Sequence, residues 1–296
     1  MSEVTEDTEQ FDIVKCYQKF LKEDPDVSMP IAAIESLVES LKDASQKLKS
    51  SVKNSISLSA GADLFLRFVT RTSHDVTNFE ACKEHLMNSG KVLVEKAAAV
   101  REKIGDLGVQ FIKDDATILI HSYSRVVMLL LQRAAACKKR FKVYVTESRP
   151  SCLGIRATKV LCKAGIPATV IYDTAVGYII DKVDAVFVGA EGVVENGGLI
   201  NAIGTYQLAV VAKAANKPFY AVIESYKFVR LFPLNQYDLP THTPDLLTFP
   251  DLEHHTDLSE DEIIGNYEAI NPSVDYTPPD YITLLCTDLG VLTPSG

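Results

Sequence analysis

The sequence predicts an α/β protein with an all-α helical N-terminal domain, residues 1–113, followed by a Rossmann-like domain, residues 114–296, whose doubly wound sheet is mainly parallel. Three observations predict this fold. Apolar residues keep helical spacing from about residue 11 to residue 113, and no strand pattern competes there. Beyond residue 114, short apolar runs alternate with helical segments. Within that half, residues 184–205 join a short apolar run to a helix through a glycine-containing loop, which is where open α/β sheets bind their ligands.

The N-terminal half is expected to consist of helices separated by short breaks. Ser28 is a suitable N-cap, and the apolar residues after it recur at spacings of three and four: Ile31, Ile34, Leu37, Val38 and Leu41. A serine-rich passage through residues 59–61 is expected to interrupt the helix. Further apolar helix faces follow at 64–69, 79–86 and 92–112.

The C-terminal half alternates between expected strands and expected helices. The strands are expected at 117–122, 142–146, 168–172, 185–188 and 219–223, with a further one at 282–285; the helices lie at about 125–138, 154–164 and 205–216. Continuous apolar strands are typical of a parallel sheet that is covered on both faces. Crossovers through the helices then produce the doubly wound sheet.

A long, proline-bearing loop at about 230–280 lacks clear periodicity, and it is either an interaction loop or a partly disordered segment. It contains His254-His255. This pair could suggest a metal, but no matching ligand set lies nearby in the sequence. A solvated loop is therefore favoured, and no metal site is expected.

The composition argues against several classes of protein. An apolar fraction of 47% supports buried cores, and a charged fraction of 23% is typical of a soluble globule. The 6 cysteines form no CxxC pair, as in reduced intracellular proteins. No signal peptide is expected at the acidic N-terminus, and no apolar run approaches the roughly 20 residues of a membrane span. The net charge of -9 argues against nucleic-acid and membrane-surface binding, so we expect a cytosolic protein.

Three strand-end loops are expected to converge at one edge of the sheet. They follow the strands that end near Ile120, Thr146 and Val188, and they supply these polar residues: Ser122, Tyr123, Ser124, Glu147, Arg149, Glu191, Glu195, Asn196 and Asn201. Gly197 and Gly198 would let the backbone approach a ligand, and free amides at the following helix start favour an anion. An ordinary connection between a strand and a helix explains this loop equally well.

Arg149 can act in two ways. Its guanidinium could bind a phosphate, or it could pair with Glu147 or Glu191 and hold the loops together. No GxGxxG follows the first strand and no GxxxxGK[ST] occurs, so a dinucleotide enzyme or a P-loop NTPase has little support. The loops favour a small polar ligand, phosphorylated or not.

The chain resembles the family that joins the alpha, beta and delta regulatory subunits of eukaryotic translation initiation factor 2B to sugar-phosphate isomerases. The resemblance lies in the strings GAEGVVENGGLINAIGT, TESRP, NPSVDYTPPDYIT and FVRLFPLNQ. Similarity to the alpha branch lies in HSYSRVV, YVTES and YITLLCTDLGVLTPS. It spans essentially the whole chain and implies a helical N-terminal bundle, a Rossmann-like C-terminal domain and a homodimer formed mainly through the C-terminal domains.

The isomerases of this family act on methylthioribose 1-phosphate and ribose 1,5-bisphosphate. They carry a cysteine in a THC-type string, where this chain has His121-Ser122. They also carry an aspartate in a GAD string, which is Glu191 here, and a lysine in an NKIGT string, which is Ala202 here. Proton transfer between sugar carbons needs a positioned acid and base, and losing one such group usually costs about 10²–10⁴-fold in rate. These replacements predict a chain without isomerase activity, so no catalytic residue is expected.

The resemblance implies that the ligand pocket is kept although the catalytic groups are replaced. The residues assigned to it are Ser122, Arg149, Arg156, Glu191, Asn196, Gly197, Asn201, Gly204 and Thr205. The expected ligand is a sugar phosphate or a nucleotide monophosphate, with no cofactor and no metal. Ala202 in place of the family lysine is expected to weaken binding.

By resemblance, the expected function is that of a non-catalytic regulatory subunit in the guanine-nucleotide exchange factor complex for translation initiation factor 2. A homodimer would bridge the complex, with the beta and delta subunits as partners and gamma and epsilon in the full assembly. The helical domain would sense the phosphorylated alpha subunit of initiation factor 2 through basic residues: Lys42, Lys47, Lys49, Lys53 and Arg71. Taken singly, each of these is more simply a solvated helix-face residue.

Two alternatives stay open. One is a sugar-phosphate aldose–ketose isomerase that uses Ser122 or Glu191 in altered roles. The other is a free-standing phosphosugar-binding homodimer outside any larger complex.

Overall fold

The computed structural model describes residues 12–23, 29–51, 56–73, 88, 91, 99–239 and 272–294, with the backbone alone at 21, 29–34 and 68–73. The chain divides into two compact units, Met1–Ala99 and Val100–Gly296. The boundary expected from the sequence, at residue 113, lies later in the chain. The difference arises because a helical stretch at 100–108 and the 3₁₀ helix Val109–Phe111 pack with the sheet, where Ile104 and Ile112 are fully buried.

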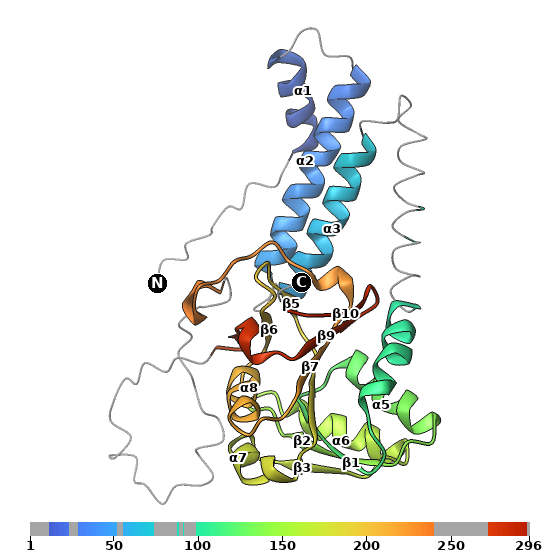
Figure 1. Cartoon of the computed structure of the whole chain (residues 1–296). Coiled ribbons are helices and arrows are strands. Elements are labelled where there is room, and N and C mark those ends of the chain that lie inside the picture. The colour runs from blue at the N-terminus through green and yellow to red at the C-terminus, as the bar shows by residue number, and fades with distance from the viewer. Residues whose placement is uncertain are drawn as a thin grey trace, which may run out of the picture. The chain divides into compact units, whose positions relative to one another are not determined.

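The first unit contains α1 (Ile13–Glu23), α2 (Met29–Ser50) and α3 (Ile56–Ser73), drawn from blue to cyan in Figure 1. The interruption predicted at 59–61 is wrong, because α3 runs through these residues without a break. Ile56 and Ala60 lie one turn apart and both are buried, so their packing outweighs the poor helix propensity of Gly61, about 1 kcal/mol. Ser28 and the helix expected at 79–86 lie outside the described residues.

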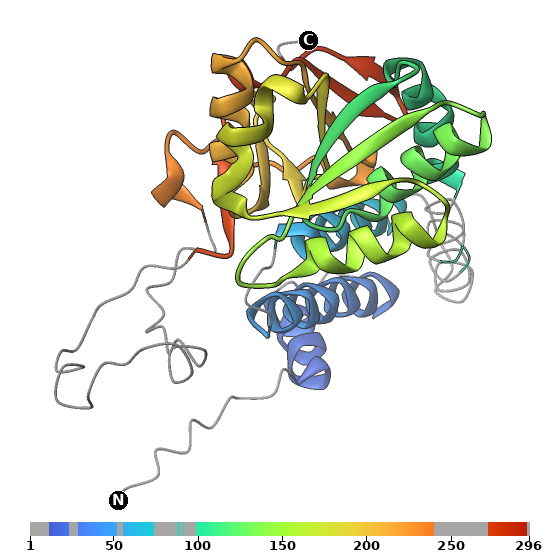
Figure 2. The same ribbon diagram turned by 90° about the horizontal axis from the view of Figure 1, so that it is seen from below.

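The second unit is organised around a seven-stranded sheet of order β10-β9-β7-β4-β1-β2-β3. Figure 2 shows strands of this sheet with helices beside them. Its parallel strands are β1 (Ala116–His121), β2 (Phe141–Thr146), β3 (Ala168–Ile171), β4 (Ala185–Val188), β7 (Phe219–Val222) and β9 (Leu284–Thr287). β10 (Gly290–Leu292) pairs antiparallel with β9 at one edge. Ile118 in β1 is in register with Val143 of β2 and Ala185 of β4. The predicted, mainly parallel and doubly wound sheet is confirmed.

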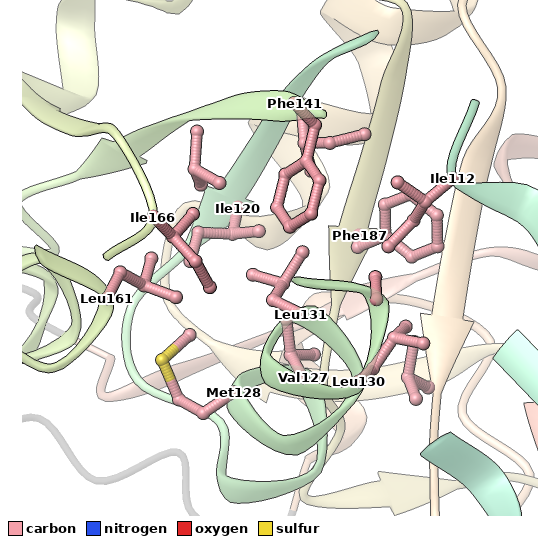
Figure 3. Close-up of a cluster of buried hydrophobic side chains, with 14 of the residues drawn as sticks. Ile112, Ile120, Val127, Met128, Leu130, Leu131, Phe141, Leu161, Ile166 and Phe187 are labelled. Atoms are coloured by element: carbon pink, nitrogen blue, oxygen red, sulfur yellow. The ribbon is translucent and has the colours of Figure 1, made fainter. Parts of the chain in front are cut away.

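Helices cover both faces of this sheet and bury alternate strand residues. α5 (Arg125–Ala136) and α6 (Leu153–Lys163) pack on one face, where Ile120 and Phe187 lie near Leu131 and Leu161 (Figure 3). α7 (Val176–Ile179) and α8 (Thr205–Ala214) pack on the other face, where Leu119 is buried. Because neighbouring residues of one strand enter different cores, both must be apolar, which explains the continuous apolar runs in the sequence.

A second, smaller sheet lies within the region that the sequence analysis treated as loop. β5 (Gly192–Val193), β6 (Leu199–Ala202) and β8 (Val274–Thr277) pair antiparallel in the order β5-β6-β8. β5 has only two residues, and β6 finds its partner β8 far along the chain, with Asn201 opposite Asp275. Beside β5, Val229 N donates to Val193 O at 2.8 Å, and a single parallel bridge joins Phe228 to Val193.

The remaining described segments connect these sheets. The 3₁₀ helices Ser225–Lys227 and Gln236–Asp238 follow β7, and a capping box between Asn235 and Asp238 fixes the second one. The strand expected at 282–285 starts instead at Leu284, because the 3₁₀ helix Pro279–Tyr281 occupies the preceding turn. His254-His255 and the rest of 240–271 lie outside the described residues. Within the described ranges, no helix is long and apolar enough to cross a bilayer.

Candidate functional site

The candidate site lies at the carboxyl edge of the large sheet. The chain leaves β1 toward β2 and β3 and then returns to β4 on the other side of β1, so the strand order reverses between β1 and β4. Open α/β sheets bind ligands at such a switch point. The loops after these two strands are in contact here, because a Cβ on Gly189 would collide with the side chain of Ser124. The fold thus brings together two of the loops that the sequence analysis singled out.

His121 fixes the geometry of this edge. Its Nδ1 lies 2.6 Å from Thr146 Oγ1 at the end of β2, and its Nε2 lies 2.9 Å from the carbonyl oxygen of Ile203. A carbonyl only accepts, so Nε2 carries the proton and Nδ1 accepts from the threonine hydroxyl. Burial lowers the pKa of His121, which keeps the imidazole neutral. With both ring nitrogens bonded, His121 holds three segments together and has no free nitrogen to act as a base.

Ser122 follows directly and is nearly buried, at 6% exposure. Its φ of 59° lies in the left-handed region, which a non-glycine residue adopts only at a cost that the surrounding packing must offset. The backbone therefore turns sharply at the position where the resemblance places a thiol. Tyr123, the next residue, packs under Arg156 of α6, whose guanidinium carbon lies 4.7 Å from the ring centroid.

Arg149 stands on the loop after β2. Its Nε lies 3.3 Å from Glu147 Oε2, so the pairing that was one of its two expected roles is present. Asp173 fixes this loop, because the backbone amides of Ser148 and Arg149 donate to its carboxylate at 2.8 and 2.7 Å. The Arg149 side chain is 59% exposed, so its charge also faces solvent at this edge.

The polar residues at the start of α8 are bonded to one another. Asn201 Nδ2 donates to Thr205 Oγ1 at 3.0 Å, and that hydroxyl donates to Ala202 O at 2.6 Å. Asn201 is 8% exposed and Thr205 is fully buried. Gly204 has a φ of 99°, and a Cβ there would lie 3.1 Å from the ring of His121. These three predicted ligand residues build the connection between β6 and α8.

Asn196 and Gly197 likewise build the turn between β5 and β6. Asn196 Nδ2 donates to Tyr276 Oη at 2.6 Å, and its Oδ1 accepts from Gly198 N at 2.9 Å. Gly197 has a φ of 83°, and a Cβ there would collide with the carbonyl of Pro294. Only glycine fits this position without strain.

The amides at the start of α8 already bind an anion supplied by the chain. Asp275 Oδ2 accepts from Gly204 N at 2.7 Å and from Tyr206 N at 3.0 Å. Burial raises the pKa of Asp275 to about 7, against which the backbone hydrogen bonds act to lower it. The anion expected here from the sequence is thus, in part, the carboxylate of β8.

A charged cluster at the ends of β4 and β7 was missed by the sequence analysis. Glu224, whose side chain is 3% exposed, accepts from Arg101 Nε at 3.0 Å and lies 3.2 Å from Lys227 Nζ. Lys227 also donates to Ala190 O at 2.7 Å, which ties it to the loop after β4. Burial alone would raise the pKa of Glu224, but Lys227 and the hydrogen bonds from Arg101 and Tyr226 lower it. We call Arg101, Glu224 and Lys227 the β7 charge cluster.

The β7 charge cluster contains two cations and one carboxylate, so it adds one net positive charge to the carboxyl edge. The Lys227 side chain is 18% exposed, and one of the three donors of its ammonium is hydrogen-bonded, to Ala190 O. The sequence carried a signal for Lys227, since polar residues directly after a buried strand of a parallel sheet reach this edge. It carried none for Arg101, which comes from the helical stretch before β1. The predicted residues Arg149, Arg156 and Glu191 lie on the loop after β2, on α6 and on the loop after β4, and Glu191 is half-buried. A net positive charge at this edge favours an anionic ligand.

The predicted regulatory residues lie in the first unit and are paired with acids on the described helices: Lys42 with Glu39 at 3.0 Å, Lys47 with Asp43 at 2.9 Å, and Lys49 with Asp63 at 2.7 Å. Lys53 lies outside the described residues, and the side chain of Arg71 is not described. Exposed pairs of this kind contribute little to stability, about 0–1 kcal/mol. A sensing role for these lysines stays a prediction.

Comparison with known proteins identifies the family. Residues 20–294 match the initiation factor 2 subunit family. The chain is 45% identical to translation initiation factor eIF2B subunit alpha of Dictyostelium discoideum, over 96% of this chain and 94% of that protein. It is 33% identical to ribose 1,5-bisphosphate isomerase of Archaeoglobus fulgidus, over 77% of this chain and 70% of that protein.

A solved structure supports the fold. The translation initiation factor eIF-2B of Pyrococcus horikoshii OT3 resembles this chain with a TM-score of 0.66 at 24% identity, covering 95% of this chain and 97% of that one. The sequence matches span both units, and they pair the same two kinds of protein, an initiation-factor subunit and a sugar-phosphate isomerase, that the sequence motifs resemble. The chain belongs to the initiation factor 2 subunit family.

Proposed function

We propose that this chain is a non-catalytic regulatory subunit of the guanine-nucleotide exchange factor for eukaryotic translation initiation factor 2. The observation that carries the proposal is the 45% identity to eIF2B subunit alpha, which extends over 96% of this chain and 94% of that protein. The likeness includes the helical unit as well as the sheet, whereas the isomerase match covers 77% of the chain.

In this proposal, two copies form a homodimer that bridges the two halves of the complex in the cytosol. The beta and delta subunits are the direct partners, and gamma and epsilon complete the assembly. The eIF2B subunit beta of Dictyostelium discoideum is itself 33% identical to this chain over 73% of it and 54% of that protein. Partners that share one fold can pack against each other in the way that identical copies do, which supports a mixed assembly of such chains.

Affinity purification of the tagged full-length chain from its native extract tests the assembly. We expect the beta and delta subunits to copurify and the exchange activity of the complex to be present in the eluate. A chain that elutes alone, as a monomer or as a free dimer, would contradict the proposal and favour the free-standing ligand-binding protein.

The sensing role is tested by charge reversal on the first unit. The triple variant Lys42→Glu, Lys47→Glu and Lys49→Glu should relieve inhibition of exchange by phosphorylated initiation factor 2 and leave the uninhibited rate unchanged, because the reversed charges repel a phosphate. Lys159→Glu with Lys163→Glu, on exposed positions of α6, is the matched control. Inhibition that persists in the triple variant would remove these lysines from the sensing surface.

The pocket at the carboxyl edge is proposed to bind a sugar phosphate or a nucleotide monophosphate. The net positive charge of the β7 charge cluster supports an anionic ligand, and Lys227 supplies an ammonium that Ala202 does not. A ligand at one hundred times its Kd stabilises the folded state by about 2.7 kcal/mol, which a thermal shift detects. We expect Lys227→Met to abolish the shift. No shift in the wild-type chain at millimolar ligand would contradict the pocket.

The isomerase match favours a second candidate function, an aldose–ketose isomerase. Two features count against it: Ser122 stands where the resemblance places a thiol, and both ring nitrogens of the neighbouring His121 are bonded. Incubating the purified chain with ribose 1,5-bisphosphate or methylthioribose 1-phosphate decides between the two. We expect no ketose, and its formation would establish an enzyme.

A further inference from the structure

A groove of about 630 Å³ runs beside α8 in the second unit. Its walls include Tyr206, Val210 and Val211 of α8, Tyr237 of the 3₁₀ helix after β7, and Val274 and Asp275 of β8. Val210 is 38% exposed and Tyr237 is 71% exposed, so apolar surface remains open to solvent along the groove. We call this feature the α8 groove.

The charge of the α8 groove comes from one residue. Among the described residues that line it, Asp275 is the carboxylate, and none is a lysine, arginine or histidine. Asp275 is 6% exposed, its Oδ2 accepts the two amides at the start of α8, and its Oδ1 is buried without a hydrogen-bond partner. A buried carboxylate oxygen that lacks a donor is unfavourable, because water no longer solvates it.

We propose that the α8 groove binds an organic cation, an ammonium or guanidinium group on an apolar body, whose N–H donates to Asp275 Oδ1. The apolar body would lie against Tyr206, Val210 and Val211. Such a ligand supplies what the groove lacks, since a charge-assisted hydrogen bond satisfies the oxygen and the positive charge balances the carboxylate. An aromatic wall adds attraction for a cation that lies over a ring face. This site shares Gly204 and Asp275 with the start of α8, and it does not depend on the proposed function.

The proposal implies that binding depends on pH. Burial raises the pKa of Asp275 to about 7, so the carboxylate form that the cation needs is a minor species at pH 6 and the major one at pH 8. The titratable residues that line the groove with Asp275 are Tyr206 on α8 and Tyr237, and the ring of His121 lies next to Gly204. The pKa of Tyr206 is raised, chiefly by its hydrogen bond with Tyr281, and that of His121 is lowered by burial. The ionised fraction of a carboxyl group with the pKa of Asp275 rises about tenfold from pH 6 to pH 8, so affinity for the cation should rise with it.

Three probes of one shape test the charge requirement on the full chain: 4-phenylbutylamine, 4-phenylbutanol and 4-phenylbutyrate. Isothermal titration at pH 8 should show saturable binding of the amine at least tenfold tighter than that of the alcohol, with the carboxylate weakest. At pH 6 the affinity for the amine should fall about tenfold, while that for the alcohol stays constant. No saturable amine binding, or equal affinity for amine and alcohol, would overturn the proposal.

Variants then assign the site. Asp275→Asn keeps an oxygen for the α8 amides and places an NH₂ at the second position, so the amine should lose its advantage over the alcohol and its pH dependence. Asp280→Asn, an exposed acid just beyond β8, is the matched control and should bind like the wild type. If Asp275→Asn fails to fold, Val210→Trp fills the groove from the exposed side of α8 and should weaken the binding of amine and alcohol alike by at least tenfold. Unchanged, pH-dependent amine binding in either variant would place the cation elsewhere.

Discussion

Two places in the second unit could attract an anion, and they differ in what already occupies them. At the start of α8, the backbone amides are bound by Asp275, and Asn201 donates to Thr205. At the ends of β4 and β7, two cations, Arg101 and Lys227, share one buried carboxylate, and one positive charge remains. The first place is closed by the chain's own side chains, and the second keeps a partly exposed ammonium.

This difference separates residues that build a loop from residues that can bind. Asparagine, threonine and glycine near a helix start are typical of a ligand loop, but the same properties make them suitable for closing a tight connection. A surplus of charge is different, because Glu224 balances only one of the two cations and the second has no carboxylate within the cluster. Charge that is left over after internal pairing is therefore the better guide to the ligand here.

The largest expected effect comes from removing the carboxylate of the β7 charge cluster. Glu224→Gln leaves Arg101 and Lys227 as neighbouring cations with little exposure, and breaking a buried pair in this way costs about 3–5 kcal/mol of unfolding free energy. Urea unfolding followed by tyrosine fluorescence measures it, because all tyrosines except Tyr17 lie after residue 100. Glu195→Gln, an exposed acid in the same region, should change stability by less than about 0.5 kcal/mol. Similar losses in both variants would mean that the cluster is solvated.

The second prediction concerns the pH dependence of the unfolding free energy, which should have opposite signs for the two regions. The native pKa of Asp275, about 7, lies above its ordinary value of 3.8, so the folded chain holds a proton that the unfolded chain releases. The contribution of Asp275 to the unfolding free energy is fully present below pH 4 and is lost as the pH rises through 7. The loss is at most about 4 kcal/mol. Glu224 has a lowered pKa, so its contribution is present above its ordinary value of 4.5 and is lost as the pH falls.

Unfolding free energies from pH 3 to pH 8 test this contrast in three chains. Asp275→Asn should flatten the decline between pH 4 and pH 7, and Glu224→Gln should remove the loss at the acidic end. A wild-type profile that rises steadily from pH 4 to pH 7, with no change in Asp275→Asn, would show that the α8 amides keep Asp275 ionised.

Most of the large sheet could be predicted because each of its strands is recognisable from its own short run of residues. The stretch from Ile118 to Ile120 is apolar throughout, since Leu119 and Ile120 enter different cores. The small sheet could not be predicted in this way. Val193 and Leu199 pair with each other in strands of two and four residues, and the third strand of this sheet, β8, follows only after the undescribed residues 240–271.

The location of the site was predictable from the sequence, but the role of each residue in it was not. A strand end followed by a glycine-bearing loop correctly marks the carboxyl edge. The sequence does not show, however, whether the Asn201 side chain binds a ligand or donates to Thr205. That choice depends on β8 and on His121, which close the loop from two other elements. Arg101 reaches Glu224 across 123 positions of sequence, so no local pattern connects them.

The smallest of these effects tests whether the α8 start is a built connection. Thr205→Val keeps the shape of the side chain but removes a buried hydroxyl, so Ala202 O loses its donor and Asn201 Nδ2 loses its acceptor. Unsatisfied buried groups of this kind cost about 1–3 kcal/mol. Thr169→Val, on the exposed side of the edge strand β3, is the matched control, with an expected change below about 0.5 kcal/mol. If Thr205→Val proved neutral in urea unfolding but weakened a sugar phosphate, the hydroxyl would belong to the ligand, and the α8 start would join the β7 charge cluster as one binding surface.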